Sequence, residues 1–308
     1  MISRRRLNPT QLTGLSILTV MVFLALLGLL APPCLSNLSP ASINLPPFQN
    51  PQHLFGTDGL GRDLLTMILK GAAGTLFVGL TAALSASIFG YCLGAFSALC
   101  GGLIDSLLMR LVDALLSVPA IVLLLTISSL ISSPEFTRTM LSVDGLKQLA
   151  QALSLTDHSL GYLPILSVVA AIAATNWLES ARVARAITQK LMTEEYMTAA
   201  RSLGAGSLHL LRFHLGPALK AVAALETTLL TADAIIMESG LTYLGLGLGP
   251  ATPSWGGMLK DAQSGLLCGN LHGAVLPGLF LALTVMGINL LATGGSRQQQ
   301  RARSKEQD

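Results

Sequence analysis

Six apolar runs, separated by polar segments, divide the sequence. They cover residues 12–31, 71–104, 114–133, 160–178, 218–248 and 274–293. A helix of about 20 mostly apolar residues crosses the hydrocarbon core of a bilayer, and each run reaches roughly that length. The pattern therefore predicts an all-α integral membrane protein with six transmembrane helices.

The first run follows three arginines, Arg4 to Arg6, and a basic start before an apolar segment is also typical of a signal peptide. This run is longer than the apolar part of a signal peptide, and no clear small-residue cleavage site precedes Pro32. These features favour a retained first transmembrane helix.

The distribution of basic residues predicts the orientation in the membrane. Cytoplasmic loops carry an excess of Lys and Arg. With the N-terminus inside, all but five of the 19 basic residues lie in cytoplasmic segments; the five are Arg62, Lys70, Arg138, Lys147 and Lys260. Both termini are therefore predicted to be cytoplasmic.

We expect one transmembrane domain over residues 1–308, with its core at 71–293. The polar segments then form an external loop at 32–70, a cytoplasmic element at 190–217 and a flexible tail at 294–308. No separate soluble domain is expected.

Composition supports the membrane class. The 308 residues are 51% hydrophobic and only 11% charged, with a mean hydropathy of +0.63. Soluble domains carry about 25% charged residues, so this chain cannot cover a globular surface in water. The net charge is only +3, and no basic stripe is interleaved with aromatic residues, so a nucleic-acid partner is not expected.

The four cysteines predict neither a metal site nor a redox motif, because no pair has CxxC spacing. Cys34 and Cys268 both fall in segments placed outside the membrane. A disulfide between them stays open, since the sequence does not fix the distance that such a bond requires.

Residues 194–217 are the longest polar and basic interruption in the second half of the chain. Thr193 can cap a first short helix, and residues 204–206 form a glycine joint before a second one. The apolar residues of the stretch are too many for a free loop: Leu203, Leu208, Leu210, Leu211, Phe213 and Leu215. A helix pair of this kind is suited to docking into a groove on another protein; the alternative is a basic loop held near anionic lipid headgroups.

The fifth apolar run contains three acids, Glu226, Asp233 and Glu238. A charge inside the membrane is unfavourable by at least a few kcal/mol, so it faces protein or water. Glu226 and Asp233 share a helix face, and Glu238 lies off it. We expect Asp233 and Glu238 to line a translocation pathway or to contact another subunit. The alternative places Glu226 and Glu238 near the helix ends and leaves only Asp233 deep.

The end of the external loop combines glycines with charged residues. The candidate loop or gate residues are Gly56, Thr57, Asp58, Gly61, Arg62 and Asp63. They form either a tight turn with an internal Arg–Asp pair or a contact with an external binding protein or the gate. The chain has no Gly-x4-Gly-Lys-Ser/Thr phosphate loop, so it is not expected to be an ATP-hydrolysing enzyme.

Four motifs, in the same order, resemble those of ABC-importer permease subunits of the dipeptide, oligopeptide and nickel branch. The pattern Ala199-Ala200-x3-Gly204-x12-Pro217 is similar to the EAA motif, and FGTDGLGRDLL is similar to the FGTDxxGRD loop. Two further strings, CGGLIDSLLMRLVDALLSVPAIVL and ESGLTYLGLGLGPATPSWGGML, resemble GGxxDxxxMRxxDxxxxxP and SFLGLGxxxPxPxWGxML. The resemblance covers most of residues 53–290 and is to the subunit type with the FGTD loop.

The resemblance implies a type I importer fold and a permease that forms half of a translocation pathway in a bacterial inner membrane. The implied partners are a sister permease, two cytoplasmic ATPase subunits, an external substrate-binding protein and membrane lipid. It implies no cofactor and no catalytic or metal-binding residue on this chain, because ATP and Mg²⁺ would bind the ATPase subunits. The cargo would be peptides, or else nickel or a metal chelate.

In that family the region equivalent to residues 194–217 is the coupling helix, which fits a cleft in the ATPase. The resemblance assigns this contact to Glu195, Thr198, Ala199, Ala200, Gly204, Arg212 and Pro217. Thr198 stands where the motif has a glutamate, and Gly216 where it has a leucine. A hydroxyl cannot make the charge-assisted contacts of a carboxylate, although Glu194 or Glu195 lies about one turn away.

Two other function classes are less well supported by the sequence. A secondary transporter driven by an ion gradient would show inverted repeats and paired charges within the membrane, and neither is clear here. A membrane scaffold without a pathway would lack acids such as Asp233 inside its spans.

Overall fold

The computed structural model describes residues 8–30, 42–133, 162–249, 252–267 and 271–307. Within these ranges the regular structure is helical, with isolated β-bridges only between Asn50 and His53 and between Thr57 and Asp63. The helices are α1 (Pro9–Leu30), α2 (Leu64–Cys100), α3 (Gly102–Leu116), α4 (Ala120–Ile131), α7 (Tyr162–Met192), α8 (Glu195–Ser202), α9 (Ser207–Leu210), the π-helix η3 (Leu211–Leu215), α10 (Gly216–Tyr243), α11 (Trp255–Asp261), α12 (Gln263–Leu267) and α13 (His272–Gln307). The all-α class is as predicted.

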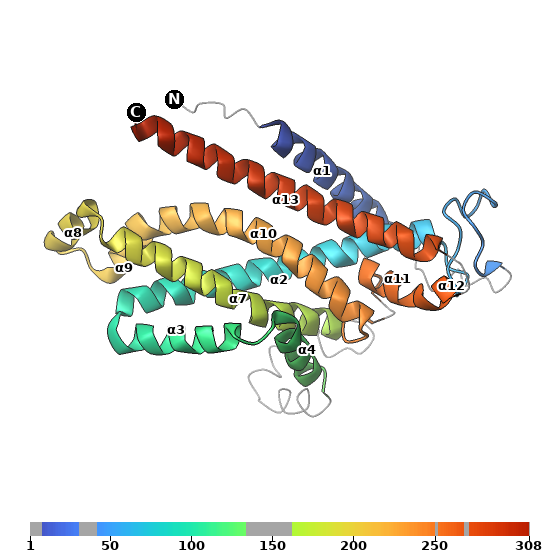
Figure 1. Ribbon diagram of the computed structural model, residues 1–308, viewed down its shortest axis with the longest axis horizontal. Helices are drawn as coiled ribbons and strands as arrows, with labels where there is room; N and C mark the ends of the chain where they lie inside the picture. The colour runs from blue at the N-terminus through green and yellow to red at the C-terminus, as the bar shows by residue number, and fades with distance from the viewer. Residues whose placement is uncertain (1–7, 31–41, 134–161, 250–251, 268–270, 308) are drawn as a thin grey trace.

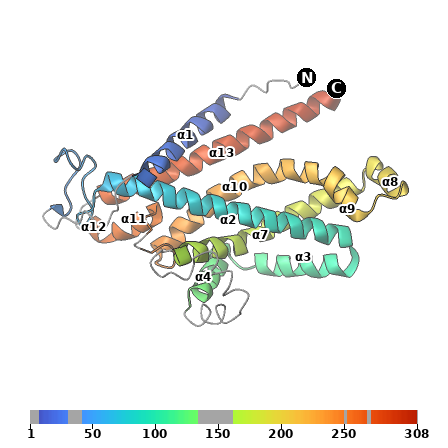
Figure 2. The same cartoon turned by 180° about the vertical axis from the view of Figure 1, so that it is seen from behind.

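The long helices α2, α7, α10 and α13 follow the long axis of the molecule (Figure 1). The short helices α8 and α9 lie at one end of this axis, and α11, α12 and the segment 42–63 lie at the other end. The view from behind gives the same arrangement (Figure 2). Helix α1 packs against α13 and α2. The two polar regions of the sequence are therefore separated by the full length of the helical bundle.

Four helices within the described residues are long and apolar enough to cross a membrane: α1, α2, α7 from Pro164, and α13 up to Gly294. Helices α3 and α4 would add a fifth crossing if the bent pair counts as one span. Helix α10 is not among them, because its charged residues Lys220, Glu226, Asp233 and Glu238 are too many for an apolar span of this length. Six predicted spans thus correspond to four clear candidates, one bent pair and one more polar helix.

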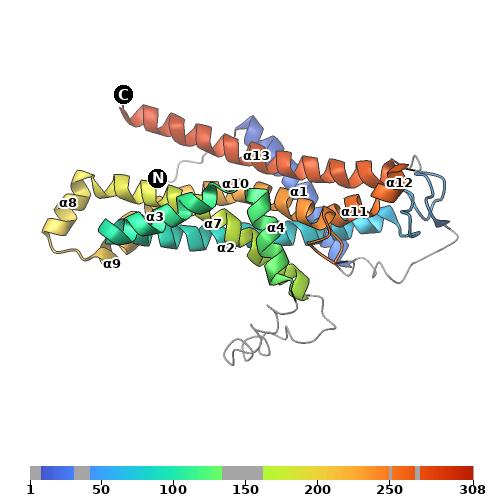
Figure 3. The same cartoon turned by 60° about the horizontal axis from the view of Figure 1, so that its bottom comes forward.

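The third predicted span is wrong as a single helix over residues 114–133. The chain bends by 97° between α3 and α4, and α4 projects away from the bundle (Figure 3). Pro119 precedes the first turn of α4 and cannot continue a helix, because it has no N–H to donate. Helix α4 alone has 12 residues, about 18 Å, which is shorter than the hydrocarbon core of a bilayer.

Helix α3 is fastened to α7 by a half-buried ion pair. The Arg185 guanidinium donates from Nε and Nη2 to the two Asp105 carboxylate oxygens, each at 2.6 Å. The Ser97 hydroxyl donates to Asp105 Oδ1 at 2.6 Å. The sequence predicts that residues 105–113 form a polar crossing between spans, whereas the structure places them within α3, with Asp105 directed into the protein.

Glycines allow α2 and α7 to approach closely. A Cβ on Gly90 would lie 2.5 Å from the Cβ of Ser180, and a Cβ on Gly94 would clash with the Ala181 carbonyl group. Small residues at helix crossings permit this backbone contact in membrane proteins, where packing rather than water exclusion drives association. These two helices therefore pack backbone to backbone at Gly90 and Gly94.

The predicted flexible tail begins within α13, which continues to Gln307. Gln, Arg, Ala, Lys and Glu dominate this segment, and they are good helix formers, which accounts for the continued helix. Cys34 and Cys268 lie outside the described residues, so the disulfide between them stays an open question.

Candidate functional site

The segment between α7 and α10 contains the glycine joint that the sequence predicts, but only the first helix is separate, because α9 continues through η3 into α10 without a break. Helix α8 ends at Ser202 and α9 begins at Ser207. Gly204 has a φ of +88°, in the left-handed region that glycine adopts without strain. The Thr193 hydroxyl does not cap α8: it donates to the Lys190 carbonyl at the end of α7, because α8 begins one residue later than a Thr193 cap requires.

The inner face of this segment is anchored to the helical bundle. Met197, Leu210 and Leu215 are buried and join one apolar cluster with residues of the long helices. The bundle residues of this cluster are Tyr91 and Ala95 from α2, Ala184 from α7 and Leu219 from α10. We call residues 195–215 the coupling segment. Its buried side chains connect it to three long helices at once.

The outer face of the coupling segment exposes large apolar side chains. Leu203, next to the glycine joint, is 89% exposed, and Phe213 is 58% exposed. The Arg212 guanidinium lies 5.6 Å from the centroid of the Phe213 ring, within the range of a cation–π contact. The docking of another protein on this face stays a prediction.

The predicted ATPase-contact residues lie in or next to this segment. Glu195, Thr198, Ala199, Arg212 and Pro217 are exposed, and Ala200 is half-buried. The Thr198 hydroxyl donates to the Glu195 carbonyl at 2.7 Å, so it bonds within its own helix. Pro217 is the second residue of α10, which follows η3 without a break, and Pro217 has no N–H to donate into this turn.

Sequence reasoning missed an aromatic group that ties α8 to η3. The rings of Tyr196 and His214 stack with their centroids 6.3 Å apart, and His209 lies 6.1 Å from His214. The π-helical turn between α9 and α10 brings these rings together. Such a turn has no reliable sequence signal, so the grouping could not be anticipated.

At the opposite end of the bundle, Arg62 fastens the loop 42–63 to α11. Its Nε donates to Asp58 Oδ2 at 2.6 Å and its Nη2 donates to Asp261 Oδ2 at 2.6 Å. Burial alone would lower the pKa of Arg62, but the Asp261 and Asp58 carboxylates outweigh it and raise the pKa above its ordinary value. The structure thus contains the internal Arg–Asp pair of the tight-turn interpretation, extended by Asp261, which the sequence did not identify.

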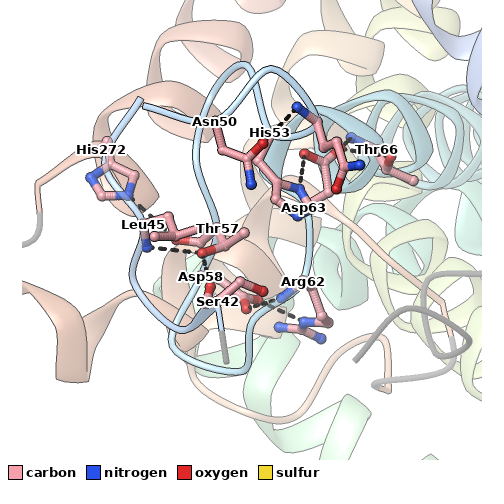
Figure 4. Close-up of polar contacts among 11 residues, drawn as sticks. Ser42, Leu45, Asn50, His53, Thr57, Asp58, Arg62, Asp63, Thr66 and His272 are labelled. Atoms are coloured by element: carbon pink, nitrogen blue, oxygen red, sulfur yellow. Dashed lines mark hydrogen bonds and ion pairs between the residues drawn. The ribbon is translucent and has the colours of Figure 1, made fainter. Parts of the chain in front are cut away.

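Hydrogen bonds fix the rest of this loop (Figure 4). The buried Thr57 hydroxyl donates to the Ser42 carbonyl and accepts from the Leu45 amide. Asp63 caps α2 by accepting from the Thr66 amide at 2.9 Å, and its other oxygen lies 3.2 Å from His53 Nδ1.

Gly56 and Gly61 have positive φ values, +79° and +75°, that the turn of the loop requires. These bonds and turns hold the loop in one conformation at this end of the bundle. A contact with a binding protein stays a prediction.

The three acids of α10 have different surroundings. Glu226 accepts hydrogen bonds from the Tyr91 hydroxyl of α2 at 2.5 Å and the Ser180 hydroxyl of α7 at 3.1 Å. Glu238 is fully buried and accepts from the Thr242 hydroxyl at 2.9 Å. Asp233 is exposed on the surface of the chain.

The expectation that Glu238 faces a pathway is wrong. The residue is five positions after Asp233, which rotates it about 140° around the helix and directs it into the protein. There it has hydroxyl partners from its own helix, Thr242 at 2.9 Å and Ser239 at 3.3 Å.

Comparison with known families decides the class. Residues 90–305 match the family described as the binding-protein-dependent transport system inner membrane component. The chain belongs to this family of inner membrane components. The match covers the coupling segment, α10 and α13, and with the apolar helices it assigns the chain to the multi-pass proteins of the bacterial inner membrane.

Among its relatives are permeases of peptide transport systems. The dipeptide transport system permease protein of Bacillus subtilis is 30% identical over 292 residues, 94% of this chain and 81% of the relative. A putative peptide permease protein of Brucella suis is 32% identical over 93% of this chain and 85% of its own length. The oligopeptide transport system permease protein of Bacillus subtilis is 28% identical over 94% of this chain and 85% of its own length. These matches confirm the resemblance to ABC-importer permeases of the peptide branch that the sequence motifs indicated.

Proposed function

We propose that this inner membrane component is one of two permease subunits of an ATP-driven peptide importer. The names of its relatives support peptides as the cargo. In this proposal a sister permease forms the other half of the pathway, two cytoplasmic ATPase subunits dock on the coupling segment, and an external substrate-binding protein delivers the peptide. ATP and Mg²⁺ would bind the ATPase subunits, and this chain would need no cofactor of its own.

The observation that carries the proposal is the two-sided character of the coupling segment. Its inner face is buried against α2, α7 and α10, while Leu203 and Phe213 are exposed on its outer face. A segment that is fixed on one side and open on the other can receive a movement from a docked protein and pass it to the helices. A free basic loop near lipid headgroups would not need buried anchors such as Met197 and Leu210.

The proposed movement is a rigid-body displacement of the coupling segment. ATP binding would bring the two ATPase subunits together, and the docked segments would follow them. Because the coupling segment continues directly into α10, the displacement would tilt α10 and the α2–α7 pair attached to it. Such a tilt exchanges inward-open and outward-open states.

The proposed topology has six spans and both termini in the cytoplasm. Helices α1, α2, α7 and α13 supply four spans, the bent pair of α3 and α4 a fifth, and α10 a sixth. The coupling segment lies at one end of the bundle and the loop 42–63 at the other, as separate membrane sides require (Figure 1). The more polar α10 is tolerated as a span if its exposed face meets the pathway or the sister permease rather than lipid.

The docking proposal is tested by a Leu203→Asp variant in the tagged, co-expressed complex. Leu203 would be buried in the ATPase cleft, where an unpaired carboxylate is strongly unfavourable. We expect the affinity for the ATPase to fall by about thirtyfold or more, so that the tagged permease purifies with its sister but without ATPase.

The matched control is Leu203→Met, which keeps an apolar side chain of similar size and should retain the ATPase. Retention of the ATPase by the aspartate variant would exclude the coupling segment as the docking surface.

A further inference from the structure

Asp233 differs from the other two acids of α10 in having no partner among the residues that the structure describes. No described residue forms a hydrogen bond or an ion pair with its carboxylate, whereas Glu226 and Glu238 each accept from hydroxyl groups. It lies well inside the 28-residue helix, at its eighteenth position. A charged carboxylate at this depth is strongly unfavourable when it faces lipid. Its position therefore requires water or a cation beside it.

The surroundings of Asp233 on α10 are apolar and open. Leu229 and Ile236 lie within a turn of it on the same face and are exposed. Gly240 lies two turns further, also on this face, and a Cβ added there would meet nothing within 4 Å. The face thus presents one negative charge between apolar side chains, beside a position with free space.

We propose that Asp233 is a specificity-determining residue that receives the α-ammonium group of the peptide as it passes through the permease. This inference rests on the proposed function and adds the group of the substrate that the pathway recognises. Peptides differ in their side chains but share an α-ammonium group, which donates three charge-assisted hydrogen bonds. A single fixed carboxylate between apolar residues binds the shared group and tolerates varied side chains.

The test measures the charge preference of the pathway without a peptide. Gly240 is replaced by Cys in a complex from which Cys34, Cys92, Cys100 and Cys268 have been removed. Position 240 lies about 10 Å along the helix from Asp233, close enough for the carboxylate to attract a cationic reagent and repel an anionic one. We expect the cationic methanethiosulfonate to modify the thiol about tenfold faster than the anionic one.

Two variants of Asp233 complete the test. Asp233→Asn removes the charge and should bring the rate ratio close to one, whereas Asp233→Glu keeps the charge and should keep the preference. Uptake of an unmodified dipeptide by the reconstituted complex should fall about tenfold in the asparagine variant, because a hydrogen bond to a charged group is lost. The glutamate variant should retain most of it.

The outcomes separate the two proposals. If neither reagent reaches the thiol in complexes that hydrolyse ATP, this face of α10 does not line a pathway, and the proposed pathway is contradicted. If both reagents react at equal rates, or if the preference survives in the asparagine variant, the pathway stands and the role of Asp233 is overturned. Loss of the sister permease from the asparagine variant would instead identify Asp233 as half of an ion pair between subunits. That result would also overturn the proposed role of Asp233 in binding the α-ammonium group.

Discussion

The close packing of α2 against α7 depends on the absence of a side chain at Gly94. A Cβ at this position would clash with the Ala181 carbonyl of α7 and lie 2.9 Å from the Cβ of Ala184. Both contacts are with a packed neighbouring helix, and a backbone carbonyl cannot rotate away. The close crossing of α2 and α7 therefore depends on glycine at this position.

We predict that Gly94→Ala destabilises the protein by about 1–3 kcal/mol, because the helices must move apart to admit the new group. The melting temperature of the detergent-solubilised complex measures this loss. Gly240→Ala is the matched control, since it makes the same change within a helix but has free space around it. It should be neutral or stabilising by about 0.4–1 kcal/mol. Equal melting temperatures for the two variants would contradict the packing described for α2 and α7.

Prediction from sequence at the residue scale succeeded where the contact is local. Arg62 and Asp58 are four residues apart, and their pairing could be predicted from that spacing. Asp261 is 199 residues from Arg62, so its contribution depends on the fold and could not be anticipated. The burial of Glu238 was not predicted, although helical arithmetic already separated this residue from the face of Asp233.

At the scale of elements, the glycine joint of the coupling segment sets the angle between α8 and α9. Gly204 adopts a φ of +88°, which other L-residues adopt only with strain of about 1–2 kcal/mol. Gly206, two residues on, has no positive φ, and a Cβ there would meet nothing within 4 Å. Of the two glycines in this joint, only Gly204 has a backbone conformation that favours glycine.

We predict that Gly204→Ala lowers ATP-driven peptide uptake about five- to thirtyfold, because the strain shifts the joint away from the geometry that docks on the ATPase. Gly206→Ala should leave uptake close to that of the unchanged protein. Initial rates in reconstituted vesicles, with the amount of permease determined by immunoblot, provide the comparison. Similar rates for the two variants would show that the angle of the joint does not matter for coupling.

The glycine joint and the helix before it could be predicted because glycine acts within a few residues, whereas the predicted Thr193 cap does not form. The buried anchors Met197 and Leu210 could not, since their contacts come from α2, α7 and α10. The bend between α3 and α4 was also missed. Pro119 was visible in the sequence, but the apolar run continued past it, and the run was interpreted as one helix.

At the scale of the whole molecule, the class was determined by composition and by the apolar runs. A chain with 11% charged residues can bury its surface only in lipid, so an all-α membrane protein could be predicted without any motif. The number of spans is harder to predict from sequence. Helix α10 is apolar but contains three acids, and α3 and α4 form a bent pair that counts as at most one span. Contacts between helices and between subunits stabilise the acids of α10 and the bend between α3 and α4, and a single sequence does not specify these contacts.

The central claim is that ATP hydrolysis by docked partners moves peptides through this permease. The most direct measurement is dipeptide accumulation in proteoliposomes that contain the permease, its sister and the ATPase subunits, with the binding protein outside. The account predicts accumulation that requires ATP inside the vesicles and is abolished by Leu203→Asp. Accumulation driven by an ion gradient in the absence of ATP would contradict it.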